Sequence, residues 1–188
     1  MNTSDFTNKI IQEVEGLIEQ AEEIKVMSLE EVSWRASESS WNILECLSHL
    51  NLYGDFYLPL IHDKIVKSAT KSEQEFHSGL LGAYFAKSML PKEKLNKMKT
   101  FKSKNPIHTD LNKEVIEVFI TQQKKLIELI HLSRKVSLSK IRIPTSISSL
   151  IQMKLGDTFQ FLINHEIRHF HQIEGVKRGL KNYQEEIV

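Results

Sequence analysis

Cysteine is almost absent from this chain of 188 residues: Cys46 is the only one, so no disulfide can form within it. Disulfide frameworks belong to oxidising compartments, and the sequence therefore predicts a cytoplasmic protein. Glycine and proline are also scarce, at 7 and 4 residues, which favours long regular elements over a turn-rich β fold. No apolar run approaches the roughly 18 residues of a membrane span, and the polar first ten residues lack the apolar core of a signal peptide.

The chain also lacks an excess of positive or of negative residues. Lys and Arg total 25 against 24 Asp and Glu, which gives a formal net charge of +1 at pH 7. A nearly neutral chain has no global attraction for nucleic acid or for an anionic membrane, so neither is expected as a partner. The lysines are nevertheless concentrated between residues 87 and 104. We interpret this stretch as a solvated loop, with an anion-binding lid as the alternative.

What the sequence has in abundance is helical periodicity. Apolar residues recur every three to four positions, which predicts helices over residues 4–27, 41–68, 111–135 and 156–180. No segment has the pattern of a strand. The expected fold is therefore all-α, a single four-helix bundle domain over residues 1–188.

Several details of these helices can also be predicted. Ser40 is the expected N-cap of the second helix, Pro59 should kink that helix, and Gly179 should end the fourth. The connections between helices 2 and 3 and between helices 3 and 4 are long, and an apolar piece at 80–90 can be partly helical. The fourth helix is apolar on more than one side, so it is either central in the bundle or covered by a partner chain.

Two histidines of the fourth predicted helix, His165 and His169, are four residues apart. Four residues advance about 40° around a helix, so both imidazoles lie on one face and can bind one metal ion. A facing helix should supply a third ligand, and His49 is the candidate because it lies within the second helix. Glu45, one turn earlier, is the candidate for a fourth group or a catalytic proton acceptor. The alternative is that these are core histidines bound to protein groups.

Residues 165–169, His-Glu-Ile-Arg-His, also match the H-E-x-x-H pattern of zinc peptidases. Glu166 would then be the general base, but on a straight helix it points about 100° away from His165. No histidine follows at the spacing of a third ligand, and no sheet is predicted that could hold a peptide. We therefore expect Glu166 to orient His165 or to contact a neighbouring helix. Cys46 is expected to pack as a small apolar group rather than to act as a nucleophile.

Both histidine-containing segments resemble those of a known family. Residues 41–50, Trp-Asn-Ile-Leu-Glu-Cys-Leu-Ser-His-Leu, are similar to the W-S-x-x-E-x-x-x-H-L signature of the DinB/YfiT-like proteins, the DNA-damage-inducible bundle family. Residues 165–173 are similar to its H-E-x-x-H-x-x-Q-I motif, and Trp34-Arg35 resembles its W-R-P element. Asn42 and Ala36 replace the usual Ser and Pro, which leaves the histidines intact.

This resemblance implies a four-helix bundle, often a homodimer, that holds a divalent metal through His49, His165 and His169. Zn²⁺, Ni²⁺ and Fe²⁺ all suit three imidazoles. Characterised relatives include transferases and isomerases that depend on a low-molecular-weight thiol, which the metal activates. The resemblance thus implies a metal-dependent thiol transferase that acts on a small-molecule substrate. The alternative is a non-catalytic bundle that stores metal or binds a partner.

Overall fold

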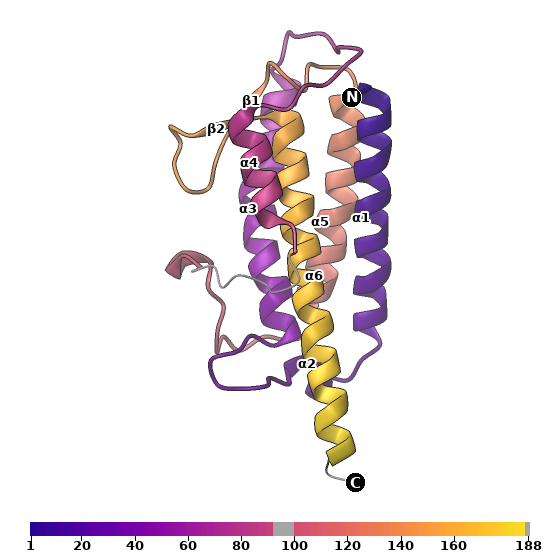
Figure 1. Ribbon diagram of the computed structural model, residues 1–188, viewed down its shortest axis with the longest axis vertical. Helices are drawn as coiled ribbons and strands as arrows, with labels where there is room; N and C mark the ends of the chain where they lie inside the picture. The colour runs from indigo at the N-terminus through magenta and orange to yellow at the C-terminus, as the bar shows by residue number, and fades with distance from the viewer. Residues whose placement is uncertain (92–99, 187–188) are drawn as a thin grey trace.

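The computed structural model describes residues 1–91 and 100–186 and has the all-α architecture expected (Figure 1). The bundle consists of the long helices α1 (Thr3–Lys25), α3 (Ile43–Val66), α5 (Glu114–Ser133) and α6 (Leu155–Glu186). Helices α1 and α3 each pack against both α5 and α6, so they lie diagonally across the bundle. The large buried side chains between the helices include Phe6, Tyr57, Phe119 and Phe159. None of the helices described combines the length and the apolarity that a membrane crossing requires.

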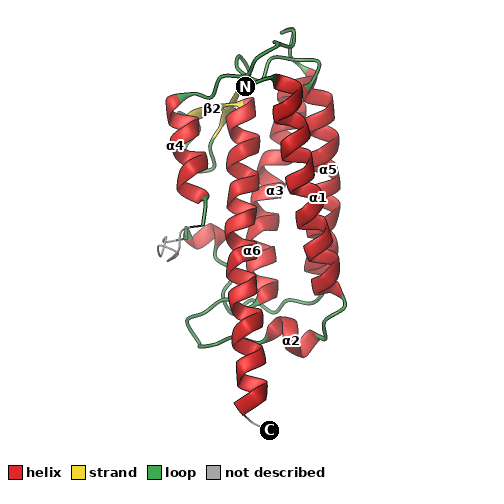
Figure 2. Ribbon diagram, turned by 45° about the vertical axis from the view of Figure 1, so that its right-hand side comes forward, coloured by secondary structure: helices red, strands yellow, loops and turns green. Residues whose placement is uncertain are grey.

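The path of the chain explains the first long connection. Helices α3 and α5 are neighbours that run in the same direction, so the chain must return along the bundle between them. It returns through α4 (Leu80–Met89), which packs against α6 outside the four long helices (Figure 2). The apolar piece expected at 80–90 is therefore a helix. Because α4 covers it, α6 can be apolar on more than one side without a partner chain.

The second long connection contains a hairpin that the periodicity did not predict. Its strands β1 (Arg142–Pro144) and β2 (Gln152–Lys154) pair antiparallel, with Ile143 opposite Met153. Both of these side chains are buried against the end of the bundle. The expectation that the chain contains no strand was wrong because three residues are too few for an alternating pattern to be recognised.

Helix boundaries also differ from those predicted. Asn42 rather than Ser40 is the N-cap of α3, whereas the predicted continuation of this helix beyond Pro59 is confirmed. The prediction that Gly179 ends α6 was wrong: the helix continues to Glu186, and no glycine of the described chain has the positive φ of a helix-ending glycine. A Cβ at Gly179 would lie 3.0 Å from the ring of Trp34. This glycine therefore provides room for Trp34, which follows the short helix α2 (Leu29–Ser33).

Two helical glycines provide a matched pair of substitutions. A Cβ on Gly82 of α4 would overlap the side chain of Asp157, whereas a Cβ on Gly16 of α1 would have no described atom within 4 Å. Gly16→Ala should stabilise the protein by about 0.5–1 kcal/mol because alanine has the higher helix propensity. Gly82→Ala should destabilise it by about 1–3 kcal/mol because α4 is pushed away from α6. Urea unfolding measures both, and a stabilised Gly82→Ala variant would contradict the packing of α4.

Candidate metal centre

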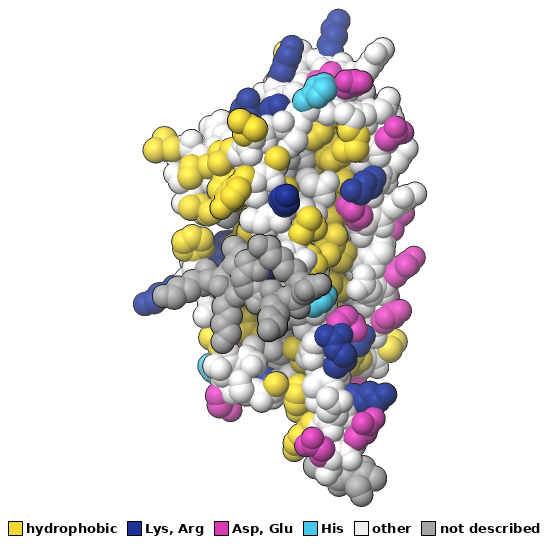
Figure 3. Space-filling model, in the orientation of Figure 1, with side chains coloured by type: hydrophobic (Ala, Val, Ile, Leu, Met, Phe, Trp, Pro, Cys, Tyr) yellow, Lys and Arg dark blue, Asp and Glu magenta, His cyan; other side chains and the backbone are white. Residues whose placement is uncertain are grey.

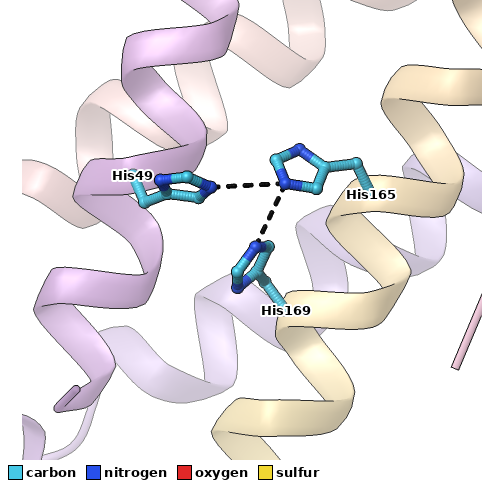
Figure 4. A group of neighbouring side chains, drawn as sticks. All are labelled: His49, His165 and His169. Carbon is cyan, nitrogen blue, oxygen red and sulfur yellow. Dashed lines mark hydrogen bonds between the residues drawn. The ribbon is translucent and has the colours of Figure 1, made fainter. Parts of the chain in front are cut away.

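Three imidazoles meet at the interface between α3 and α6 (Figure 4). His49 projects from α3, and His165 and His169 project from successive turns of α6. Nε2 of His165 lies 3.3 Å from Nε2 of His49 and 3.1 Å from Nε2 of His169. The structure thus brings together the three histidines that the sequence singled out. The remaining histidines of the chain are exposed: His62, His77, His108, His131 and His171.

The hydrogen bonds made by Nδ1 of His49 and His169 determine that Nε2 of each ring carries no proton. Nδ1 of His49 lies 2.6 Å from the backbone oxygen of Lys104, which can only accept, so Nδ1 carries the proton. Nδ1 of His169 donates in the same way to Oε1 of Gln172 at 3.1 Å. The Nε2 atoms of both rings therefore direct lone pairs at His165. Nδ1 of His165 is buried and has no hydrogen-bond partner among the described residues.

Too few protons are available where the three Nε2 atoms converge. A hydrogen on Nε2 of His165 can be donated to one neighbouring ring, which leaves the lone pair of the other unsatisfied. A cation between the rings would satisfy all three nitrogens. In a tetrahedral site with Zn–N distances of about 2.0–2.1 Å, neighbouring ligand nitrogens lie about 3.3 Å apart, close to the two distances from His165. The ligand atoms of all three residues lie within 4.8 Å of one another. The three-histidine cluster is therefore compatible with a divalent metal.

Burial keeps the imidazoles in the neutral form that binds metal. His49, His165 and His169 are 3%, 6% and 8% exposed. Burial lowers the pKa of His49 to about 4 and the pKa of His169 to about 3. Burial, followed by the neighbouring imidazoles, also lowers the pKa of His165 well below its ordinary value. At pH 7 a cation therefore does not have to compete with a second proton on any of these rings.

Aromatic side chains surround the imidazoles. Trp41 stacks on His169 with 5.8 Å between ring centroids. Tyr53 of α3 lies 4.6 Å from His165, and Phe161 stacks on the same imidazole at 6.0 Å. These rings restrict the orientations that the imidazoles can adopt.

One side of the cluster is held by residues 100–109, which we call the strap and which include the short turn η1 (Lys102–Lys104). The backbone oxygen of Lys104 accepts the hydrogen bond from His49, and its ammonium donates to the backbone oxygen of Leu52 on α3 at 2.6 Å. For Lys104 the expectation of a solvated lysine was therefore wrong. Residues 92–99 of the lysine-rich stretch lie outside the described residues.

Glu45 is bound to the protein rather than directed at the imidazoles. Its fully buried carboxylate accepts from Nη2 of Arg35 at 3.0 Å, from the backbone N–H of His108 at 2.6 Å and from the backbone N–H of Asn42 at 2.9 Å. Among the described residues, the group of metal-competent side chains contains the three histidines and not Glu45. Its observed contacts are those of a helix cap and of an anchor for the strap.

Glu166 also points away from the cluster. Its Oε1 accepts from Nε2 of Gln123 on α5 at 3.0 Å, so the expected contact with a neighbouring helix is confirmed. The glutamate of the H-E-x-x-H pattern is thus not placed as the base of a peptidase would be. Burial raises the pKa of Glu166 to about 8. Burial also raises the pKa of the Cys46 thiol, which packs in the core as an apolar group.

The raised pKa of Glu166 predicts a pH-dependent effect of Glu166→Gln in the metal-free protein. The carboxyl titrates near 8 in the folded state and near 4.5 in the unfolded state, so the wild type loses stability as the pH rises between these values. The variant lacks this loss. Its free energy of unfolding, relative to that of the wild type, should therefore increase by on the order of 2 kcal/mol from pH 5 to pH 7. Urea unfolding at both pH values measures the gain. Glu185→Gln on the exposed end of α6 is the control, and a gain of the same size at both pH values would contradict the prediction.

Sequence comparison finds one family for this chain. A family model described as the DinB superfamily matches residues 14–173, a range that contains all three histidines of the cluster. No curated protein and no solved structure matches the chain significantly.

Proposed function

The chain belongs to the DinB superfamily, and we propose that its three-histidine cluster binds one divalent metal ion in a metal-dependent thiol transferase. The observation that carries the proposal is the convergence of three Nε2 atoms in a group whose ligand atoms all lie within 4.8 Å of one another. The Nε2 atoms of His49 and His169 direct their lone pairs at the third ring. This geometry suits a bound cation better than it suits three neutral imidazoles alone.

In this proposal, residues around the cluster orient the histidine ligands. The Lys104 carbonyl and the Gln172 amide orient His49 and His169, so that Nε2 of each ring faces the metal position. Three histidines leave coordination positions open, which is typical of catalytic rather than structural sites. A bound metal would lower the pKa of a coordinated low-molecular-weight thiol and so supply a thiolate nucleophile.

Elemental analysis tests the metal itself. Protein purified without a metal-affinity tag should contain a divalent metal, or should take up one equivalent of Zn²⁺ or Ni²⁺ after treatment with a chelator. Protein that is free of metal and cannot be loaded would overturn the proposal.

A separate assay tests the reaction. The metal-loaded protein is incubated with low-molecular-weight thiols, such as cysteine and glutathione, together with epoxide or alkyl halide electrophiles, and thiol consumption is followed. We expect consumption that depends on the metal. Stoichiometric metal binding without turnover of any thiol would favour the second candidate, a non-catalytic metal-binding bundle.

A further inference from the structure

The nearly neutral total charge of the chain conceals an uneven distribution of acidic residues along it. Three described segments, residues 76–91, the strap and residues 137–154, contain no Asp or Glu. Their basic residues are Lys87, Lys102, Lys104, Lys140, Arg142 and Lys154. Because the net charge of the whole chain is +1, the remainder of the chain is net acidic.

The same three segments carry exposed apolar side chains. Leu80 at the start of α4 is 96% exposed, and Leu150 in the hairpin loop is 92% exposed. Further large apolar side chains that are exposed here are Leu81, Tyr84, Phe101 and Ile147. In Figure 3 hydrophobic side chains gather over α4 and the hairpin loop, whereas most acidic side chains of this view lie towards the opposite edge, over α1, and the C-terminal end.

Two of these segments adjoin one another, and the strap lies on the same side of the bundle. Lys154 of β2 donates from Nζ to the backbone oxygen of His77, directly before α4, so the hairpin and the start of α4 lie side by side. In Figure 1 the hairpin loop and the strap project from the side of the bundle on which α4 lies. We call the combined surface of α4, the hairpin loop and the strap the apolar–basic face.

The composition of the apolar–basic face selects among possible occupants. A symmetric contact with a second copy would place two basic surfaces together with no acidic residue from these segments between them, which is unfavourable. A contact with the acidic side of another copy would be head-to-tail and would form an open filament unless its rotation closes into a ring. Leucines at the tips of two elements, surrounded by lysines, instead fit a bilayer, in which apolar side chains enter the headgroup region and basic ones attract anionic lipid.

We propose that the apolar–basic face binds to the surface of an anionic phospholipid bilayer. The protein would lie on the membrane through Leu80, Leu150 and the surrounding basic side chains, with α1 facing away from the lipid. This proposal does not depend on the metal or on the reaction proposed for the three-histidine cluster.

Vesicle co-sedimentation of the full-length chain tests the proposal. One set of vesicles contains phosphatidylcholine alone, and the other also contains roughly 30 mol% phosphatidylglycerol as the anionic lipid. The protein should sediment with the anionic vesicles and not with the neutral ones, and about 0.5 M salt should release it. Equal binding to both kinds of vesicle, or binding to neither, would overturn the proposal.

Substitutions of apolar residues test whether this face makes the contact. Leu80→Asp and Leu150→Asp change exposed side chains, so both variants should keep the unfolding midpoint of the wild type. Each should weaken binding to anionic vesicles by about tenfold or more, because a side chain that enters the bilayer is lost. Val26→Asp is the matched control, because Val26 is 85% exposed beyond the end of α1 and outside the face. Unchanged binding of the two leucine variants would exclude this face.

Charge reversals provide an independent measurement. Lys87→Glu and Arg142→Glu should each weaken binding about fivefold, whereas Lys181→Glu on the far end of α6 should have little effect. Light scattering in the absence of lipid tests whether a second copy of the chain covers this face. A dimer that dissociates in the Leu80→Asp variant would assign the face to a second copy. Retention of polyglutamate in the absence of vesicle binding would assign it to an acidic protein. Either result would overturn the bilayer proposal.

Discussion

His169→Ala should abolish the Zn²⁺-dependent rise in thermal stability that we expect of the wild-type protein. A ligand present at about a thousand times its dissociation constant adds about 4 kcal/mol to the free energy of unfolding. For a chain of this size such a gain corresponds to a rise in Tm of roughly 10 °C. Without the Nε2 atom of His169, only two of the three converging ligands remain, and the rise should disappear. Differential scanning calorimetry with and without Zn²⁺ measures it.

His171→Ala provides the control for this experiment. His171 lies on the same helix two residues later but is exposed, so its removal should leave the Zn²⁺-dependent rise unchanged. Circular dichroism should show that both variants keep the helical content of the wild type. An equal rise in Tm for His169→Ala and the wild type would contradict the assignment of this residue as a ligand.

Arg35→Ala should destabilise the protein by about 3–5 kcal/mol, the cost of leaving a buried charge without its partner. The Glu45 carboxylate is completely buried, and Arg35, whose side chain is 21% exposed, is the cation that it contacts at 3.0 Å. Its remaining hydrogen bonds come from backbone N–H groups, which do not neutralise its charge. Urea unfolding measures the loss, and Glu38→Ala in the same connection is the control, because Glu38 is exposed.

The same substitution should also affect the metal site through the strap. Glu45 binds the backbone N–H of His108, which has a φ of 59°, an unusual value for a residue other than glycine. When Glu45 loses Arg35, the strap loses part of its anchor, and the Lys104 carbonyl orients His49 less firmly. Metal affinity should then fall about tenfold, as for other losses of a group that orients a ligand. Metal affinity equal to that of the wild type, together with a loss of stability below 1 kcal/mol, would contradict the structural role of this ion pair.

The helices of the bundle and the pair of histidines on α6 could be predicted because both depend on local geometry. Apolar spacing of three and four residues identifies a helix wherever it occurs, and two side chains four residues apart share a face whatever surrounds them. Tyr53 could have been found in the same way, since it lies one turn after His49. The continuation of α6 past Gly179 could not have been predicted. This glycine makes room for the ring of Trp34, which comes from a distant part of the chain.

The strap, the Arg35–Glu45 pair and the hairpin lie outside what periodicity can predict. Irregular segments have no repeating pattern, and their partners depend on where the chain path places them. The helices, the family resemblance and the three candidate ligands could be predicted from sequence alone. The folded arrangement was needed to show that Glu45 binds Arg35 and the strap, that Glu166 faces α5, and that α4, the hairpin loop and the strap form an apolar and basic face. A helix is specified by neighbours in sequence, whereas burial, ion pairing and surface charge are specified by neighbours in space.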